Sequence, residues 1–346
     1  MLARAALALL SVLATTSAAQ AQSGEITVMA YAGIFQDKYT EAVIKPFTAK
    51  FPNVKVNYFS SGNSAQMLGT LRTQRSSPQV DVAILDVSVS NVGNKEGVFA
   101  KLDPAKVPSL KELHPMAIVP DGFGPAVTFD HWVLVYDAEK VKPAPTSLAD
   151  LWDPRFKGQI GLPAMPNIQG IAATVLASKI AGEDFKTSID GAMKRLKDLG
   201  PSVQTFDPQP DGYTLILGNT LTVASGWNAR AQLYHDESKG RLGVVFPKEG
   251  SVFQINTINL VAGNKNPEAA TAFIEYALGR EAQKRFTEAM FYAPTNAKAE
   301  ISPAAINRTA ASAENMAKMI PLDWDWVTTI RDSWNNRWRR EVIAGR

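Results

Sequence analysis

The pattern of hydrophobic and polar positions changes period several times along the first part of the chain. Residues 26–30 are a short β-prone run, and residues 35–51 then repeat apolar side chains at helical spacing. Residues 54–59 alternate like a half-buried strand, and residues 80–85 are almost wholly apolar, as strands of parallel sheets are. Strands and helices that alternate in this way predict a mostly parallel α/β sheet.

Three loops follow the predicted strands, at Tyr31–Gly33, Ser60–Ser64 and Asp86–Ser90. In a parallel α/β sheet the carboxyl ends of the strands share one edge, and ligands bind there. We therefore expect the three loops to lie together and to form part of a binding site.

The later part of the chain repeats the pattern. Val127–Tyr136 is a long β-prone run, which we expect to pass from one lobe to another. Further strands are predicted at residues 159–162, 221–225 and 242–246, and helices at residues 168–181 and 185–199. The tryptophan-rich residues 324–340 are predicted to form a helix packed on the second lobe. This order predicts two α/β lobes.

Residues 246–278 are expected to return the chain to the first lobe. They begin with a turn signal that contains proline and glycine. Val252–Val261 follows and is rich in β-branched and aromatic residues, which predicts a strand. Asn266 is a favourable N-cap residue and Pro267 suits the first helical position, so an amphipathic helix is predicted next.

The N-terminus has the composition of a secretory signal peptide. Arg4 precedes an apolar run from Ala5 to Leu13, and Ala19–Ala21 provides an A-x-A cleavage site. The apolar run is too short for a membrane-spanning helix, which needs roughly 20 residues. We expect residues 1–21 to be removed and the remaining chain to be exported as a soluble protein.

Composition excludes several classes of function. The chain has no cysteine, which excludes thiolate metal sites and cysteine nucleophiles. Removal of Arg4 with the signal peptide leaves 35 basic and 33 acidic residues, a formal net charge of +2. This balance gives no indication of nucleic-acid or membrane-surface binding. We expect a monomer without cofactor or bound metal.

Sequence motifs of common enzymes are absent. The three histidines, His114, His131 and His235, are far apart in sequence. There is no H-E-x-x-H, G-x-S-x-G, P-loop or dinucleotide-binding glycine motif. We therefore expect a protein without catalysis. A secreted enzyme on a two-lobed α/β scaffold, with catalytic residues from distant positions, is the alternative from another class.

Polar and aromatic residues collect where the predicted strands end, and solute pockets combine such groups with apolar walls. The candidate ligand-binding residues are Tyr31, Ser61, Asn63, Asp86, Ser88, Trp227, Asn228, Arg230 and Asn256. Several also have a purely structural interpretation. Trp227 would suit a core, Asp86 a helix N-cap or a solvated loop, and Arg230 an exposed helix face. Ser61 and Asn63 would suit the start of the helix near Ala65.

Five segments resemble periplasmic solute-binding proteins of ABC importers, in the group that includes spermidine and putrescine binders. They are TSLADLWDPRFKGQIGL at 146–162, ASGWNA at 224–229, FPKEG at 246–250, NPEAATAFIEYAL at 266–278 and YAPTNAKA at 292–299. Their order and spacing are similar to those of the family over nearly all of the chain after the signal peptide.

The resemblance implies a two-lobed periplasmic binding protein fold (type II). Each lobe would be a mostly parallel sheet flanked by helices, and crossing hinge strands would join the lobes. Lobe 1 would contain residues 22–128 and 250–300, and lobe 2 residues 129–249 and 301–346. The loop Ala164–Gln169 would face lobe 1. The family implies a periplasmic receptor that closes on a small organic solute and delivers it to an inner-membrane permease.

Two positions depart from the polyamine binders of this group. Those proteins have an aspartate where this chain has Asn256, and acidic residues where the loop Pro163–Asn167 has none. A polyamine needs a carboxylate near each ammonium, because an unpaired buried charge is costly. Asp86 and Arg230 instead suggest a zwitterion, such as an amino-acid-like compound, or a monoamine. A polyamine ligand is the alternative. Iron binders of the family use neighbouring tyrosines, and no Tyr-Tyr pair occurs here.

Overall fold

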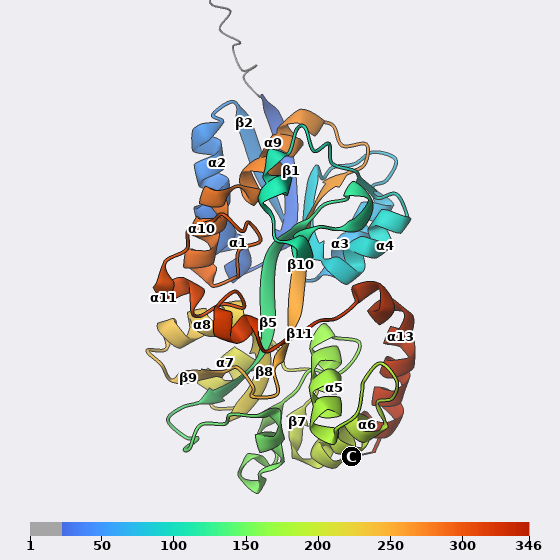
Figure 1. Ribbon diagram of the computed structural model, residues 1–346, viewed down its shortest axis with the longest axis vertical. Coiled ribbons are helices and arrows are strands. Elements are labelled where there is room, and N and C mark those ends of the chain that lie inside the picture. Colours follow the sequence, from blue (N-terminus) through green and yellow to red (C-terminus); the bar gives the residue numbers. More distant parts are fainter. Residues whose placement is uncertain (1–22, 346) are drawn as a thin grey trace, which may run out of the picture.

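The computed structural model describes residues 23–345 and shows two lobes joined by long strands (Figure 1). β5 (Ala126–Asp137) and β10 (Ser251–Val261) lie antiparallel and run together from one lobe to the other. The predicted two-lobed α/β fold with crossing strands is confirmed. The predicted signal peptide, residues 1–21, lies outside the described residues.

Lobe 1 is built on β1 (Gly24–Tyr31), β2 (Val54–Ser61) and β3 (Val82–Asp86). β1 pairs in parallel with both β2 and β3, and β10 then joins β3 in the antiparallel direction. The short β4 (Phe99–Ala100) also pairs with β10. The helices of this lobe are α1 (Ile34–Tyr39), a π-helical turn (Thr40–Ile44), α2 (Lys45–Lys50), α3 (Ser64–Thr73), α4 (Val87–Lys95), α9 (Pro267–Leu278) and α10 (Arg280–Met290).

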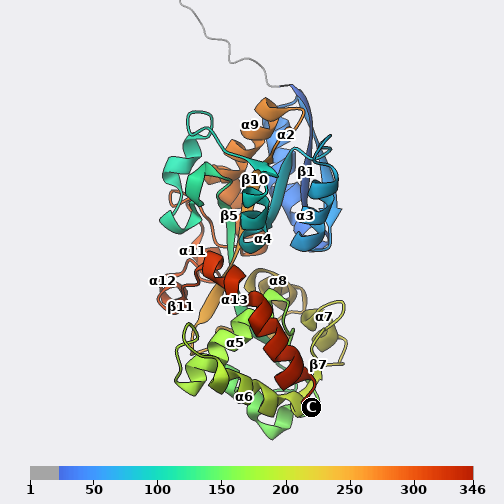
Figure 2. The same ribbon diagram turned by 90° about the vertical axis from the view of Figure 1, so that its right-hand side faces the viewer.

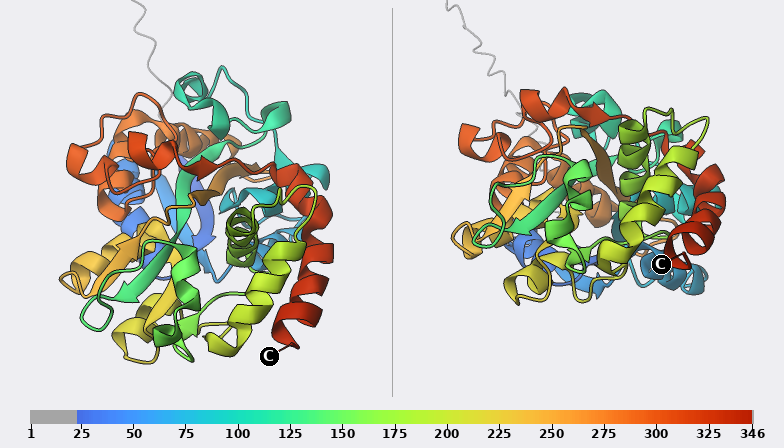
Figure 3. Two further views of the ribbon diagram at one scale, coloured as in Figure 1. Left: turned by 60° about the horizontal axis from the view of Figure 1, so that its bottom comes forward. Right: turned by 90° about the horizontal axis from the view of Figure 1, so that it is seen from below.

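Lobe 2 continues the same sheet beyond β5. Its strands are β6 (Ile160–Gly161), β7 (Val203–Thr205), β8 (Val223–Trp227) and β9 (Leu242–Val245). β8 and β9 pair antiparallel with β5, whereas β6 lies parallel to β7 and β8. The helices are α5 (Ile168–Ala181), α6 (Asp190–Leu199), α7 (Gly212–Leu217), α8 (Asn228–Glu237) and α13 (Trp324–Arg337). Figure 3 shows α5 and α6 side by side, with the dark red α13 at the outer edge.

A third connection follows α10. The chain passes through α11 (Pro303–Ile306) and α12 (Ala313–Met316) to β11 (Met319–Ile320), which pairs with β10. It then enters α13, and the C-terminal tryptophans pack on lobe 2 as predicted. Trp338 is fully buried, and its indole N–H donates to Thr174 Oγ1 of α5 at 2.8 Å. Short 3-10 helices lie at Pro108–Glu112, Pro115–Ala117, Pro120–Gly122, Leu148–Trp152, Pro154–Phe156 and Gly200–Ser202, and a π-helical segment at Trp338–Ile343.

Two details differ from the sequence prediction. The helix predicted from residue 185 begins only at Asp190, because the Glu183 carboxylate accepts hydrogen bonds from the backbone N–H groups of Gly191 and Ala192. These bonds satisfy first-turn amides from outside the helix. Asn266 does not cap α9 with its side chain; its amide instead donates to the Glu25 carbonyl oxygen at 2.6 Å and ties α9 to β1.

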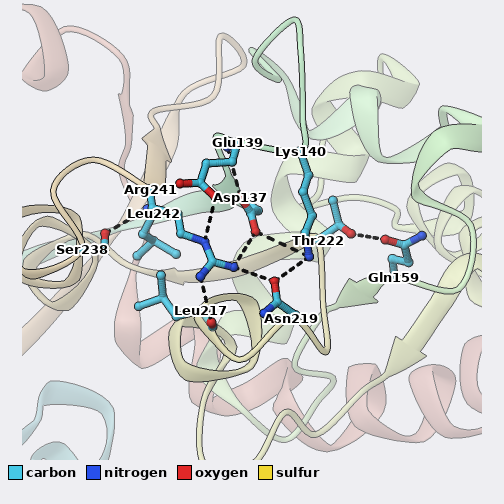
Figure 4. A network of polar contacts seen from close by, with 10 residues as sticks. All are labelled: Asp137, Glu139, Lys140, Gln159, Leu217, Asn219, Thr222, Ser238, Arg241 and Leu242. Atoms are coloured by element: carbon cyan, nitrogen blue, oxygen red, sulfur yellow. Dashed lines mark hydrogen bonds and ion pairs between the residues drawn. The ribbon is translucent and has the colours of Figure 1, made fainter.

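A buried polar network fixes the end of β5 in lobe 2 (Figure 4). The Asp137 side chain is 0% exposed, and Arg241 Nη2 donates to its Oδ2 at 3.0 Å. Arg241 also donates to Asn219 Oδ1 at 2.6 Å, and Lys140 Nζ donates to the same oxygen at 2.7 Å. Burial alone raises the pKa of the Asp137 carboxyl, but the hydrogen bonds from Arg241 and the Glu139 backbone N–H outweigh it and lower the pKa.

Arg241→Ala should lower the thermal unfolding midpoint by several degrees, because Asp137 would stay buried without its main partner. Lys140→Ala is the matched control, since the Lys140 side chain is 45% exposed and its nitrogen lies 3.7 Å from the carboxylate. Circular dichroism melting curves of both variants measure the difference. Equal, small changes in the two midpoints would contradict the importance of this ion pair.

Candidate ligand-binding site

A cleft of about 1190 Å³ lies between the lobes. Lobe 1 contributes Tyr31, residues 62–65 and the start of α4, and lobe 2 contributes residues 163–169, residues 205–213 and the end of β8. The predicted loop Ala164–Gln169 therefore faces lobe 1 across the cleft. A cavity of this size is ample for a small organic solute.

The three predicted lobe 1 loops meet at one edge of the sheet. The Tyr31 hydroxyl donates to Asn256 Oδ1 at 2.8 Å and lies 2.9 Å from Ser64 Oγ. Ser64 Oγ also accepts the backbone N–H of Asp86 at 3.0 Å. These bonds join β1, the start of α3 and the end of β3, and they hold the Tyr31 ring in the cleft wall.

Six of the nine predicted site residues line the cleft: Tyr31, Asn63, Asp86, Ser88, Trp227 and Arg230. Ser61, Asn228 and Asn256 are not among the lining residues. The Ser61 hydroxyl lies 3.4 Å from a backbone oxygen of its own loop. Asn228 is buried, and its amide donates to the Arg308 carbonyl oxygen at 2.7 Å.

Asn256 lies beneath the cleft wall. Its side chain is fully buried, and both of its amide atoms have partners. Oδ1 accepts from the Tyr31 hydroxyl, and Nδ2 donates to Thr128 Oγ1 at 2.9 Å. The amide thus joins the crossing strand β10 to β5 and to Tyr31. In this position Asn256 supports a wall residue.

Asp86 caps α4 and also lines the cleft. Its interpretation as a helix N-cap is confirmed, and its interpretation as a ligand-binding residue stays a prediction. Its Oδ1 accepts the backbone N–H and the hydroxyl of Ser88, at 2.9 and 2.5 Å. Its Oδ2 has no hydrogen-bond partner within residues 23–345, although the residue is only 7% exposed. Burial raises the pKa of the Asp86 carboxyl, while the Ser88 hydrogen bonds and the charge of Arg331 oppose that rise. A buried carboxylate oxygen without a partner favours a ligand that donates a proton or carries positive charge.

The backbone that carries Trp227 is held rigidly. The Tyr213 hydroxyl accepts the Trp227 N–H at 2.5 Å and donates to the Trp227 carbonyl oxygen at 3.0 Å. Gly226 permits this clamp, because a Cβ atom there would lie 2.5 Å from the Tyr213 ring. Two residues further on, the Asp130 carboxylate accepts the backbone N–H of Ala229 at 3.1 Å. Side chains on this segment are therefore presented from a fixed backbone.

Arg230 has the opposite charge to Asp86 and is also unpaired. Its side chain is half-buried and lines the cleft, and it forms no hydrogen bond or ion pair with the part of the chain that the structure describes. A guanidinium group carries five N–H donors in a planar fork and remains charged in proteins. Such a group matches a carboxylate or a phosphonate.

Helix N-termini also contribute positive potential to the cleft. Residues at the starts of α3, α4, α5 and α8 line it. The first turn of a helix exposes backbone N–H groups and the positive end of the helix dipole. Asn63, Asp86 and Asn167 each satisfy one of these amides with a side-chain oxygen. The remaining first-turn amides favour a ligand with an anionic group.

Sequence reasoning missed other cleft residues. Arg331 comes from α13, which the sequence identified only as a packing helix. Tyr213 lies in the first turn of α7, a short helix with no recognisable motif. Tyr292 lies in the YAPTNAKA segment, which carried the family resemblance but no site assignment. One sequence signal was available for Tyr213. Gly226 of the ASGWNA segment leaves space on β8 for the Tyr213 ring.

Two α/β lobes with a solute-sized cleft at the strand ends, joined by three chain crossings, define a binding protein that encloses a small solute. Residues 42–314 match the bacterial extracellular solute-binding protein family, and the chain belongs to this family. The resemblance seen in the sequence is confirmed, and the function is capture of a small solute.

Individual proteins to which the chain is similar are also solute-binding proteins by name. The chain is 29% identical over 303 residues to spermidine/putrescine-binding periplasmic protein 1 of Haemophilus influenzae, covering 82% of this chain and 80% of that protein. It is 27% identical over 294 residues to the γ-aminobutyric acid-binding protein of Pseudomonas aeruginosa, with the same coverage. The crystal structure of an ABC transporter protein from Clostridium perfringens superposes with a TM-score of 0.72 at 27% identity, covering 92% of this chain and 99% of that one.

Asn256→Asp should destabilise the protein by about 1–3 kcal/mol, because a carboxylate would replace a buried amide whose N–H₂ group bonds Thr128. It should not produce putrescine binding, since residue 256 lies behind Tyr31. Asn228→Asp is a control for a buried amide on the other lobe. Denaturant unfolding and calorimetric titration with putrescine measure both effects, and a gain of putrescine affinity in Asn256→Asp alone would contradict this placement.

Proposed function

We propose that this protein is the periplasmic receptor of an ABC importer and that its solute carries both an ammonium and an anionic group. The observation that carries this proposal is the pair of unpartnered, opposite charges in one cleft. Asp86 offers a free carboxylate oxygen, and Arg230 offers a free guanidinium group. Each would be satisfied by the complementary end of a zwitterion.

Aromatic rings supply the walls between the two charges. Tyr31, Trp227 and Tyr292 all line the cleft. Burial and the Asp86 charge raise the pKa of Tyr31, so its hydroxyl remains a neutral hydrogen-bonding group. Flat faces of this kind contact a short aliphatic chain and interact favourably with an ammonium group.

Two acidic residues favour the polyamine alternative. Asp207 and Asp211 also line the cleft, and the H. influenzae relative is a spermidine/putrescine binder by name. Asp211 accepts the Thr214 N–H and Asp207 accepts the Gln209 amide, each at 2.8 Å, and neither residue has a buried oxygen without a partner, as Asp86 does. Asp207 is also exposed to solvent, which screens its charge. A diamine would bring a second ammonium toward Arg230.

The remaining assignments follow from the family. The receptor would be exported with removal of residues 1–21, act as a monomer without catalysis or nucleic-acid binding, and present its closed form to an inner-membrane permease. None of the described helices is long and apolar enough to cross a membrane. The hinge would lie in β5 and β10, which favours residues 22–128 with 250–300 and residues 129–249 with 301–346 as the two moving bodies.

γ-Aminobutyrate and putrescine form a matched pair of probes, because both have four carbons and one terminal amine and differ only at the other end. γ-Aminobutyrate should raise the thermal midpoint of the purified protein, and putrescine should not. Mass spectrometry should recover the solute unchanged. A larger shift with putrescine would favour the polyamine alternative, and chemical turnover of a bound solute would indicate an enzyme.

Arg230→Gln should weaken γ-aminobutyrate binding by roughly 10–100-fold, because a charge-assisted contact to the carboxylate is lost. Arg339→Gln is the control, since Arg339 is exposed and does not line the cleft. Calorimetric titration gives both dissociation constants. Equal affinities for the two variants would remove Arg230 from the proposed site.

A further inference from the structure

Arg331 brings a second arginine to the end of the cleft where Asp86 lies. It extends from α13 of lobe 2, and Figure 2 shows α13 lying across from α4 of lobe 1. Arg331 Nη2 donates to the Pro166 carbonyl oxygen at 2.8 Å, and Nη1 lies 3.5 Å from Ser88 Oγ. Ser88 in turn donates its hydroxyl proton to Asp86 Oδ1. A single hydroxyl group therefore separates the guanidinium from the carboxylate.

The two charges are neighbours, but they are not paired with each other. Within residues 23–345 Arg331 forms no ion pair, and Asp86 Oδ2 accepts no hydrogen bond. The contacts with Pro166 and Ser88 use two of the five N–H donors of Arg331. Both side chains line the cleft, so both retain hydrogen-bonding capacity for a ligand.

An α-amino-acid group matches this arrangement, because its ammonium and its carboxylate are attached to one carbon. The ammonium would bond Asp86 Oδ2, and the carboxylate would accept N–H groups of Arg331. Asp86 and Arg331 come from opposite lobes. A group that binds both would make its full set of contacts only when the lobes are together, which favours the closed form.

We propose that Asp86 and Arg331 bind the α-amino-acid group of the solute and that Arg230 binds a second anionic group further along it. The solute class is an α-amino acid with an anionic side chain. This inference rests on the proposed function, since it divides the same cleft into an amino-acid end and an anion end. It assigns Arg331 the role of distinguishing such a compound from an amine that lacks the α-carboxylate.

Three pairs of compounds test the role of Arg331, because each pair differs only by an α-carboxylate. They are L-aspartate and β-alanine, L-glutamate and γ-aminobutyrate, and L-2-aminoadipate and 5-aminopentanoate. In the pair whose chain length fits, the wild-type protein should bind the amino acid roughly tenfold or more tightly than its partner. Arg331→Gln should abolish that difference and leave the affinity for the decarboxylated partner nearly unchanged. Arg339→Gln should behave like the wild type.

If Arg331 only links α13 to Ser88 structurally, the result should differ. Arg331→Gln would then weaken the binding of both compounds of a pair by the same factor. That result, or equal wild-type affinities within every pair, would overturn the inference and leave the proposed function standing. Failure of the wild type to bind any of the six compounds would overturn both. Arg331→Lys provides a second variant if Arg331→Gln melts early; it keeps the charge without the planar fork and should retain only part of the discrimination.

Discussion

The antiparallel pairing of β5 with β10 is the constraint on which both lobes and the cleft depend. The two strands pair from Thr257 to Phe253 on one side and from Ala126 to His131 on the other. At the lobe 1 end, Asn256 of β10 bonds both Thr128 and Tyr31. Two residue pairs further toward lobe 2, Asp130 of β5 holds the first turn of α8. The same pair of strands therefore supports a wall residue of each lobe, and it is where we propose that the lobes move relative to each other.

We propose that charge placement then decides what the cleft accepts. Asp86 lies at the end of β3, Arg230 in the first turn of α8, and Arg331 on α13, so each charge comes from a different element. Lobe 1 supplies the carboxylate and lobe 2 supplies both guanidinium groups. Hydrogen-bonding groups without partners cost free energy in the empty cleft, and a complementary solute would remove that cost by bonding them. On the proposed binding mode, this difference would favour the closed, occupied form.

The sequence predicts the lobes and the crossing strands well, because hydrophobic periodicity reports which faces are buried. It predicts Asp86 and Trp227 as strand-end residues for the same reason. It fails where a side chain outside a helix determines the residue at which the helix begins. Glu183 does so for α6, because its carboxylate accepts backbone N–H groups of the first turn. It also fails for Arg331, which contacts a serine 243 positions earlier in the chain. Period-two alternation likewise places Asn256 and Gln254 on one side of β10, yet only Gln254 reaches the cleft, since Tyr31 covers Asn256.

The central claim is that an anionic group of the solute is held by the Arg230 guanidinium, opposite the Asp86 carboxylate. A crystal structure of the protein with its solute bound tests this most directly. The account predicts an oxyanion of the solute within about 3 Å of the Arg230 nitrogens and a nitrogen of the solute at the same distance from Asp86 Oδ2. A solute whose ammonium groups occupy the cleft while Arg230 contacts only protein or water would contradict it.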